Sequence, residues 1–144
     1  MSLKSLRINV DEAVNGDWVK FSANADGTVP RFLLKRSSKL NKAYTKAMRN
    51  LIERHSNING ELDPKLVNEE EFEAENLEIF VDTLLGGWEN NQPNDDGVEL
   101  PYSRENAIKF LGDPQWATVY GTLQERVKVI GNEHARKLEA NAKN

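Results

Sequence analysis

Apolar positions in residues 17–36 form two short runs on either side of a polar turn. The runs DWVKF and VPRFLL flank the sequence NADG at residues 24–27, which favours a turn. This predicts a β-hairpin whose second strand begins at or after Pro30, because proline has no amide proton for a strand ladder. An isolated hairpin is marginally stable in water, so we expect it to pack on helices or to pair with a third strand. Residues 6–10, LRINV, are the candidate for that strand.

From residue 38 onward the apolar positions follow the spacing of an amphipathic helix. The first such helix is predicted over about residues 39–55, with Ser37 or Ser38 as its N-cap. Its apolar stripe consists of Leu40, Ala43, Tyr44, Ala47, Met48, Leu51 and Ile52.

A second helix is predicted to begin at Asp63-Pro64, because a capping side chain followed by proline is typical of helix N-termini. The sequence Gly86-Gly87 predicts its end, since glycine favours the left-handed conformation of a C-cap. The apolar stripe of this helix consists of Leu77, Phe80, Val81, Leu84, Leu85 and Trp88.

Two more helices follow a polar loop. Ser103 is predicted to cap a short helix that ends at Gly112, and Asp113-Pro114 to start the last helix. The stripe of the last helix consists of Trp116, Val119, Tyr120, Leu123, Val127, Ile130, His134 and Leu138. The predicted fold class is therefore α+β and mostly α. A β-hairpin or small antiparallel sheet in residues 1–37 precedes about four helices in residues 38–140, and together they form one compact unit.

Composition narrows the class of protein. A chain of 144 residues fits one domain and can bury roughly 68–70% of its unfolded surface. The absence of cysteine excludes disulfides, zinc–thiolate sites and cysteine nucleophiles. No stretch reaches the roughly 18 apolar residues of a membrane span, and the first 16 residues lack the apolar region of a signal peptide. We therefore expect a soluble intracellular protein without a membrane partner.

Charge is segregated along the chain although the net charge is only −4. Residues 31–54 carry eight cations and one acid, whereas residues 61–99 carry thirteen acids and one cation. Such opposite fields favour pairing within the molecule, head-to-tail self-association or steering of a charged partner.

The polar loop in residues 87–102 suggests a calcium site, which its spacing then excludes. With Gly97 at the glycine position of a calcium-binding loop, Gln92 stands first and Ser103 twelfth, so two defining carboxylates are missing. A turn at Asp95-Asp96 is the better interpretation.

No other pattern indicates catalysis. Neither His55 nor His134 lies in a metal-binding or catalytic triad motif, and no glycine-rich phosphate loop occurs. The acids of residues 69–78 could in principle serve an enzyme, but they lack apolar cover and are typical of a solvated helix face. We predict no catalytic residue, no metal and no cofactor.

The basic segment leaves a nucleic-acid-binding accessory protein as an alternative function, with residues 38–54 as the binding helix. However, Tyr44 belongs to the apolar stripe, where it cannot stack on a base without losing core contacts. The whole chain is also acidic, with a pI of about 5.3. These features argue against nucleic acid as the partner. The candidate basic interaction face consists of Arg36, Lys39, Lys42, Lys46 and Arg49.

The segment LLGGWENN…DDGVELPYSRENAIKFLGDP, residues 84–114, resembles the signature region of the tail assembly chaperones of long-tailed siphophages. Residues 26–49 also resemble that family's strand leading into a basic helix, and the order of elements agrees over about residues 15–144. The residues that carry the resemblance in the signature region are Gly87, Trp88, Glu89, Asn90, Pro101, Tyr102, Ser103, Glu105, Asn106, Ala107 and Leu111.

The resemblance implies a non-catalytic phage or prophage protein. Such chaperones bind the tape measure protein, keep it soluble, help to recruit tail tube subunits and leave before the virion is complete. It therefore implies action in the cytoplasm of a bacterial host, and the segregated charge favours a homo-oligomer along a filamentous client. The motif residues serve either the fold, with Trp88 packing on Pro101-Tyr102 and the loop joining two helices, or direct partner contact.

Overall fold

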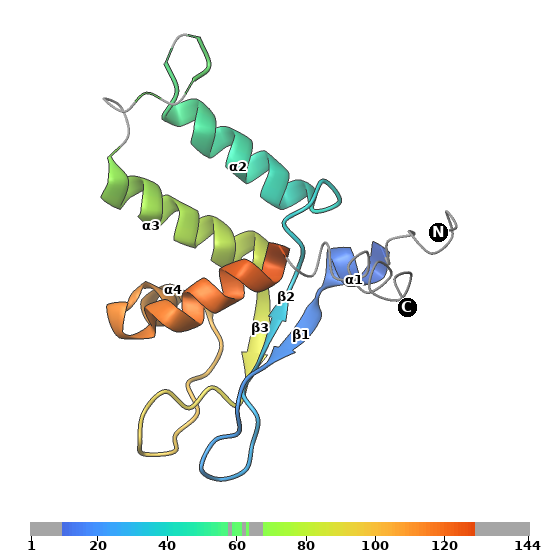
Figure 1. The fold of residues 1–144 in the computed structure, drawn as a ribbon, viewed down its shortest axis with the longest axis vertical. Helices are drawn as coiled ribbons and strands as arrows, with labels where there is room; N and C mark the ends of the chain where they lie inside the picture. The colour runs from blue at the N-terminus through green and yellow to red at the C-terminus, as the bar shows by residue number, and fades with distance from the viewer. Residues whose placement is uncertain (1–9, 58, 62, 64–67, 129–144) are drawn as a thin grey trace, which may run out of the picture.

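The computed structural model describes residues 10–57, 59–61, 63 and 68–128, and its elements are drawn in Figure 1. They confirm the α+β, mostly α fold: a small antiparallel sheet is followed in sequence by helices. The strands are β1 (Asp17–Lys20), β2 (Arg31–Leu34) and β3 (Leu85–Glu89). The helices are α1 (Val10–Asn15), α2 (Lys42–Arg54), α3 (Glu69–Ile79), α4 (Arg104–Gly112) and residues 117–128, with a π-helical turn η2 (Phe80–Leu84) and a 3-10 turn η3 (Pro114–Trp116).

The predicted hairpin is confirmed. β1 and β2 pair antiparallel with Val19 opposite Phe32, and β2 begins directly after Pro30. Two backbone hydrogen bonds close the turn between them, where the sequence places its polar turn residues: the amide of Asn24 donates to the carbonyl of Thr28, and the amide of Gly27 donates to the carbonyl of Asn24.

The third strand of the described sheet is β3, which the sequence predicted to be the end of a helix. Residues 6–9 lie outside the described part of the chain, and Val10 begins α1. Residues 85–89 form a strand rather than the end of a helix. Pairing of β3 with β2 leaves Gly86 as an extra residue in a bulge, where a Cβ atom would lie 2.9 Å from Cδ2 of Leu33. Gly86 thus permits a close strand approach instead of capping a helix.

The helix that precedes β3 ends early because its last carbonyls are used elsewhere. Leu84 accepts a hydrogen bond from the amide of Lys35 at 2.7 Å, and the Thr83 carbonyl accepts one from Nδ2 of Asn41 at 2.8 Å. These bonds tie η2 to the segment between β2 and α2. Leu85 and Trp88, predicted in a helical stripe, are consequently core residues of a strand.

Two helix starts differ from the prediction because asparagines cap them. Asn41 accepts a hydrogen bond from the amide of Tyr44, so α2 begins at Lys42 and is not capped by Ser37 or Ser38. Asn68 accepts one from the amide of Glu71, so α3 begins at Glu69. The predicted start at Asp63-Pro64 is therefore wrong, and Pro64 itself lies outside the described residues.

The later helix starts are confirmed. Ser103 Oγ accepts from the amide of Asn106 at the start of α4, which ends at Gly112. Asp113 caps η3, which leads into the helix at residues 117–128. Ile130, His134 and Leu138 of the predicted stripe lie outside the described residues.

The core joins the sheet to α3, η2, α4 and the helix at residues 117–128. Figure 1 shows α2 and α3 as an arm that projects from the sheet, with α3 nearer to the last helix. The buried side chains at the sheet and its neighbouring helices include Phe32, Leu34, Phe80, Leu84, Trp88, Phe110, Leu111 and Leu123. On α2, by contrast, the apolar stripe contributes a single fully buried side chain, Leu51.

Candidate interaction surfaces

Trp88, the centre of the sequence motif, is a core residue. It is 5% exposed and makes edge-on ring contacts at centroid distances of 5.8 Å with Phe32, 5.7 Å with Phe110 and 5.1 Å with Tyr102. Its Nε1–H donates to the carbonyl of Leu100 at 2.8 Å. Trp88 therefore fastens the loop after β3 onto the sheet and α4, as its expected packing on Tyr102 implied.

Glu89 and Asn90 fix the same loop to the hairpin. Glu89 Oε2 lies 2.6 Å from a guanidinium nitrogen of Arg31 on the neighbouring strand. Asn90 adopts a left-handed conformation with φ 58°, donates through Nδ2 to the carbonyl of Val29, and donates its amide to Oε1 of Glu99. Both side chains have partners inside the molecule. The loop joins a strand to a helix, which corrects the expected helix-to-helix connection.

Pro101, Ser103 and Asn106 organise the start of α4. Asn106 Nδ2 donates to the carbonyl of Pro101 at 2.9 Å, while its amide donates to Ser103 Oγ at 3.0 Å. Glu105 lies one turn before Lys109 and pairs with it at 3.1 Å on the exposed side of the helix. Pro101, Ser103 and Asn106 of the sequence motif therefore hold the start of α4 in place.

Tyr102 is the motif residue that combines a fixed ring with an open surface. Its side chain is 40% exposed, and its hydroxyl donates to the carbonyl of Leu85. Burial, together with the nearby negative charge of Asp82, raises the pKa of Tyr102. Asp82 itself forms a two-bond pair with Arg104, at 2.7 and 3.1 Å.

Aspartates in the loop between β1 and β2 and in the loop after β3 accept hydrogen bonds that close turns. The Asp26 carboxylate accepts from the hydroxyl and amide of Thr28 and from Nε2 of Gln92, and these hydrogen bonds lower its pKa to about 2. Asp96 accepts from the amide of Val98 within the turn predicted from the sequence. Among the described residues, no group of three or more acidic or histidine side chains is arranged to hold a metal ion.

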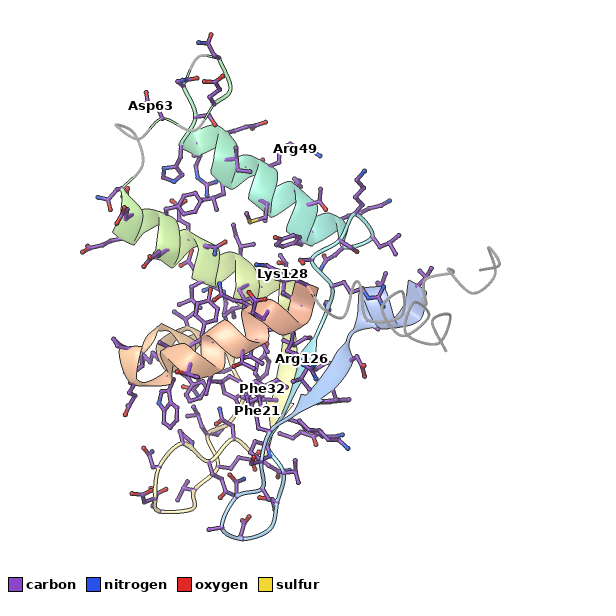
Figure 2. The ribbon with its side chains drawn as sticks, in the orientation of Figure 1. Phe21, Phe32, Arg49, Asp63, Arg126 and Lys128 are labelled. Atoms are coloured by element: carbon purple, nitrogen blue, oxygen red, sulfur yellow. The ribbon has the colours of Figure 1, made fainter. Side chains whose placement is uncertain are left out.

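The predicted basic face is present on α2, but Arg36 does not belong to it. Lys39, Lys42, Lys46 and Arg49 are exposed and form no ion pair with any described residue. Arg36 is 5% exposed. It follows Phe32 and Leu34 at intervals of two and so continues the buried side of β2, a strand periodicity that the sequence itself contains. Figure 2 shows Arg49 on the side of α2 that points away from α3.

Two ion pairs between described residues join the basic segment, residues 31–54, to the acidic segment, residues 61–99. Arg31 pairs with Glu89 between strands, and Arg54 pairs with Glu75 between helices. Glu75 on α3 contacts Arg54 and Nε2 of His55, each at 3.1 Å, at the end of α2. The His55 hydrogen bond, followed by the Arg54 hydrogen bond, lowers the pKa of Glu75. His55 is buried against the Phe72 ring and caps the end of α2, as its predicted place at a helix C-terminus implied. His134 lies outside the described residues.

A groove of about 440 Å³ runs along the flank of α2, and we call it the α2 groove. Tyr44, Met48 and Ile52 form its apolar wall. Its charged margin consists of Lys39, Arg49 and Glu53. Next to it, Tyr44 and Met48 also line a hollow of about 360 Å³ that α2 shares with α3 and the helix at residues 117–128.

A second groove, of about 790 Å³, lies between the first half of α3, the end of α4, η3 and the start of the next helix. We call it the acidic groove. Phe72, Leu77, Leu111 and Tyr120 give it apolar walls. Its charged side chains are all acidic: Glu70, Glu73 and Asp113. Burial, with a smaller effect of the Glu73 charge, raises the pKa of Tyr120 to about 12.

A sequence model described as YdaY prophage protein matches residues 39–144, well over half of the chain. This chain belongs to the YdaY prophage protein family. A search of curated proteins and a search of solved structures each returned no match.

Membership of the YdaY family confirms the prediction of a phage or prophage protein. The matched range includes α2, α3, β3 and α4, but not β1 and β2, with which β3 completes its sheet. None of the helices that the structure describes is long and apolar enough to cross a bilayer.

The acidic groove of this YdaY protein was not predicted. Glu70 and Glu73 were interpreted only as part of a solvated acidic face. Their spacing of three on α3, on either side of the apolar Phe72 and one turn before Leu77, was the available signal. The contribution of Tyr120 from another helix depends on the tertiary fold.

Proposed function

We propose that this YdaY-family protein is a non-catalytic phage tail assembly chaperone that binds the tape measure protein and helps to recruit tail tube subunits. It would act in the cytoplasm of the bacterial host and be absent from the mature virion. The proposal starts from the sequence resemblance in residues 84–114. The observation that carries it is the incompletely buried apolar stripe of α2.

An amphipathic helix in a globular protein normally buries its apolar stripe against the core. On α2, however, Ile52 is 41% exposed and Leu40, just before the helix, is 39% exposed. Tyr44 and Met48 are half-buried and line the α2 groove. This groove therefore offers apolar contacts to an additional helix, in the helix-in-groove mode of recognition.

A tape measure protein, as the resemblance implies, presents long apolar helix surface until the tail tube encloses it. Exposed surface of that kind aggregates. A small protein with a partly open apolar groove can cover such a helix by binding alone, without changing a covalent bond.

Co-expression with the tape measure protein of the same prophage tests the proposal. We expect the full chain to increase the soluble fraction of the tape measure protein and to copurify with it. Ile52→Glu places a charge on the groove wall and should weaken copurification by at least about tenfold, which corresponds to about 1.4 kcal/mol. Asn50→Glu adds the same charge at an exposed α2 position that lies outside the apolar stripe and does not line the groove, and should have little effect.

Circular dichroism of both variants separates loss of binding from loss of folding. The chaperone proposal is rejected if the tape measure protein stays equally insoluble with and without the wild-type chain. It is also rejected if the two glutamate variants behave alike while both remain folded.

The exposed cations of α2 keep a nucleic-acid-binding accessory phage protein as a second candidate. Lys42 and Lys46 are free of ion pairs with described residues and could contact phosphates. Tyr44, which such a protein would need for stacking, is half-buried in the α2 groove. Titration of duplex DNA at several salt concentrations discriminates, because phosphate contacts produce an affinity that falls steeply with log salt.

A further inference from the structure

The side chains that line the acidic groove limit which side chains an occupant can carry. Its walls present the rings of Phe72 and Tyr120 beside Leu77, and these favour apolar side chains. Glu70, Glu73 and Asp113 supply its charge, and no cationic side chain among the described residues lines it. An occupant that fits must therefore carry apolar residues with cations close beside them, because three carboxylates would repel an acidic or strongly polar segment.

The chain contains a helix of this description. Tyr44, Met48 and Ile52 follow one another at intervals of four, so they share one flank of α2. The same flank is bordered by two cations, Lys39 and Arg49, and by one acid, Glu53, so its margin carries a net positive charge. Lys39 and Arg49 have no ion-pair partner among the described residues. The flank is open to solvent at Ile52, which is 41% exposed.

The two surfaces are separate parts of one chain. The α2 groove and the acidic groove share no lining residue. Within the chain, α2 is fixed by the buried Leu51 and by the bonds of Asn41 to the backbone of Arg36 and Thr83. Within the described part of the chain, this flank is therefore not covered by the acidic groove and is open to another molecule.

We propose that the acidic groove of one copy binds the α2 flank of a second copy, so that the protein associates with itself head to tail. Ile52 and Met48 would contact the ring-lined walls, while Arg49 and Lys39 would pair with Glu70 and Glu73. Such a contact joins two different surfaces, so each added copy presents a free α2 at one end and a free acidic groove at the other. Repetition of this contact gives a chain or a ring of copies, depending on the rotation between neighbours.

Self-association in this form does not depend on the proposed chaperone activity. If that activity is also correct, the second copy and the tape measure helix compete for α2, because both contact the α2 groove. Client binding would then dissociate the chain of copies. That consequence rests on the proposed function, whereas the contact between copies can be tested without any client.

Charge reversal on each surface provides the test. Lys39→Glu with Arg49→Glu changes the α2 flank, and Lys42→Glu with Lys46→Glu is the control with the same charge change on α2 residues outside the groove. Glu70→Lys with Glu73→Lys changes the acidic groove. Its control is Glu69→Lys with Glu71→Lys, which alters exposed acids of the same helix turn that do not line the groove.

Sedimentation velocity of the full chain at low salt should show a mass that increases with concentration and decreases as salt is added. Each groove variant should weaken self-association at least about tenfold relative to its control. Mixing the two groove variants should restore growth, because the intact flank of one variant meets the intact groove of the other and the two reversed surfaces also carry opposite charges. Combining all four reversals in one chain should restore growth.

A wild-type chain that remains monomeric at high concentration and low salt overturns the proposal. So does equal association of the groove variants and their controls, or failure of the two groove variants to pair. If the lysine substitutions unfold α3, Glu70→Gln with Glu73→Gln removes the charge more mildly and should still weaken association. Unchanged association of that folded variant would also overturn the proposal.

Discussion

Trp88 in the sheet and Ile52 on α2 both belong to apolar stripes of the sequence, yet their environments differ. Trp88 is 5% exposed and lies among three aromatic rings, whereas Ile52 is 41% exposed at the wall of a groove. The sheet, α4 and the loop between them form an interlocked unit. The α2 helix is held chiefly by Leu51, Asn41 and the contacts of His55.

This difference shows that the sequence motif and the proposed partner surface lie in different parts of the molecule. The motif residues around Trp88 are largely engaged in holding the loop and capping α4. The open apolar side chains lie instead on α2, where the sequence shows an ordinary amphipathic helix. The motif residues mainly serve the fold, and α2 supplies the surface that we propose for partners.

Trp88→Ala should produce the largest effect. It removes three ring contacts and leaves the Leu100 carbonyl without its indole donor, so we expect a loss of about 3–5 kcal/mol in the free energy of unfolding. Urea titration followed by circular dichroism measures it. Trp88→Phe keeps a ring but loses the N–H, and should be destabilised less. A loss below about 1 kcal/mol for the alanine variant would mean that the sheet unit is not the stable half of the molecule.

Adjacent substitutions on α2 sharpen the contrast within one helix. Leu51→Ala empties a fully buried site and should cost about 2–5 kcal/mol. Ile52→Ala removes a largely exposed side chain and should cost less than about 1 kcal/mol. Equal destabilisation in urea titrations would contradict the assignment of Ile52 to an open groove wall.

The smallest predicted effect concerns pH. Because His55 and Arg54 hold the pKa of Glu75 below its ordinary value of 4.5, the Glu75 carboxylate stabilises the folded state above that pH. Its contribution decreases as the pH falls from 4.5 through the folded pKa. Glu75→Gln should therefore show a shallower loss of unfolding free energy on acidification than wild type.

Glu78→Gln, at an exposed position of the same helix, is the control for this pH dependence. It should retain the wild-type slope between neutral and acidic pH in urea titrations. Parallel curves for wild type and Glu75→Gln would show that the contact between α2 and α3 has no protonation-dependent component.

Much of the fold could be predicted because local signals agree with tertiary structure. The hairpin turn, the cap at Ser103 and the start at Asp113-Pro114 each depend on side chains that bond to neighbouring backbone, and these predictions are confirmed. Such signals lie within a few residues of the feature they specify.

The wrong predictions concern elements whose ends are determined by contacts between residues far apart in the sequence. Gly86 is typical of a helix end in sequence, but the approach of Leu33 from another strand makes it a bulge residue. The helix before it stops because Lys35 and Asn41 bond to its carbonyls from more than 40 positions earlier in the chain. No local pattern contains that information. Arg36 is different: its placement on the basic face was wrong, although the two-residue period of β2, extended to residue 36, is a local signal for its burial.

The position of α2 and α3 between β2 and β3 has a consequence for divergence. Leu34 at the end of β2 lies opposite Leu85 at the start of β3, so the intervening helices leave the sheet and return to it at neighbouring points. The three strands thus form a meander that carries the two helices as an insertion, with both ends anchored to the scaffold. Substitutions of exposed side chains on that insertion can therefore leave the strand register intact, so that its surface can diverge without a change in the sheet.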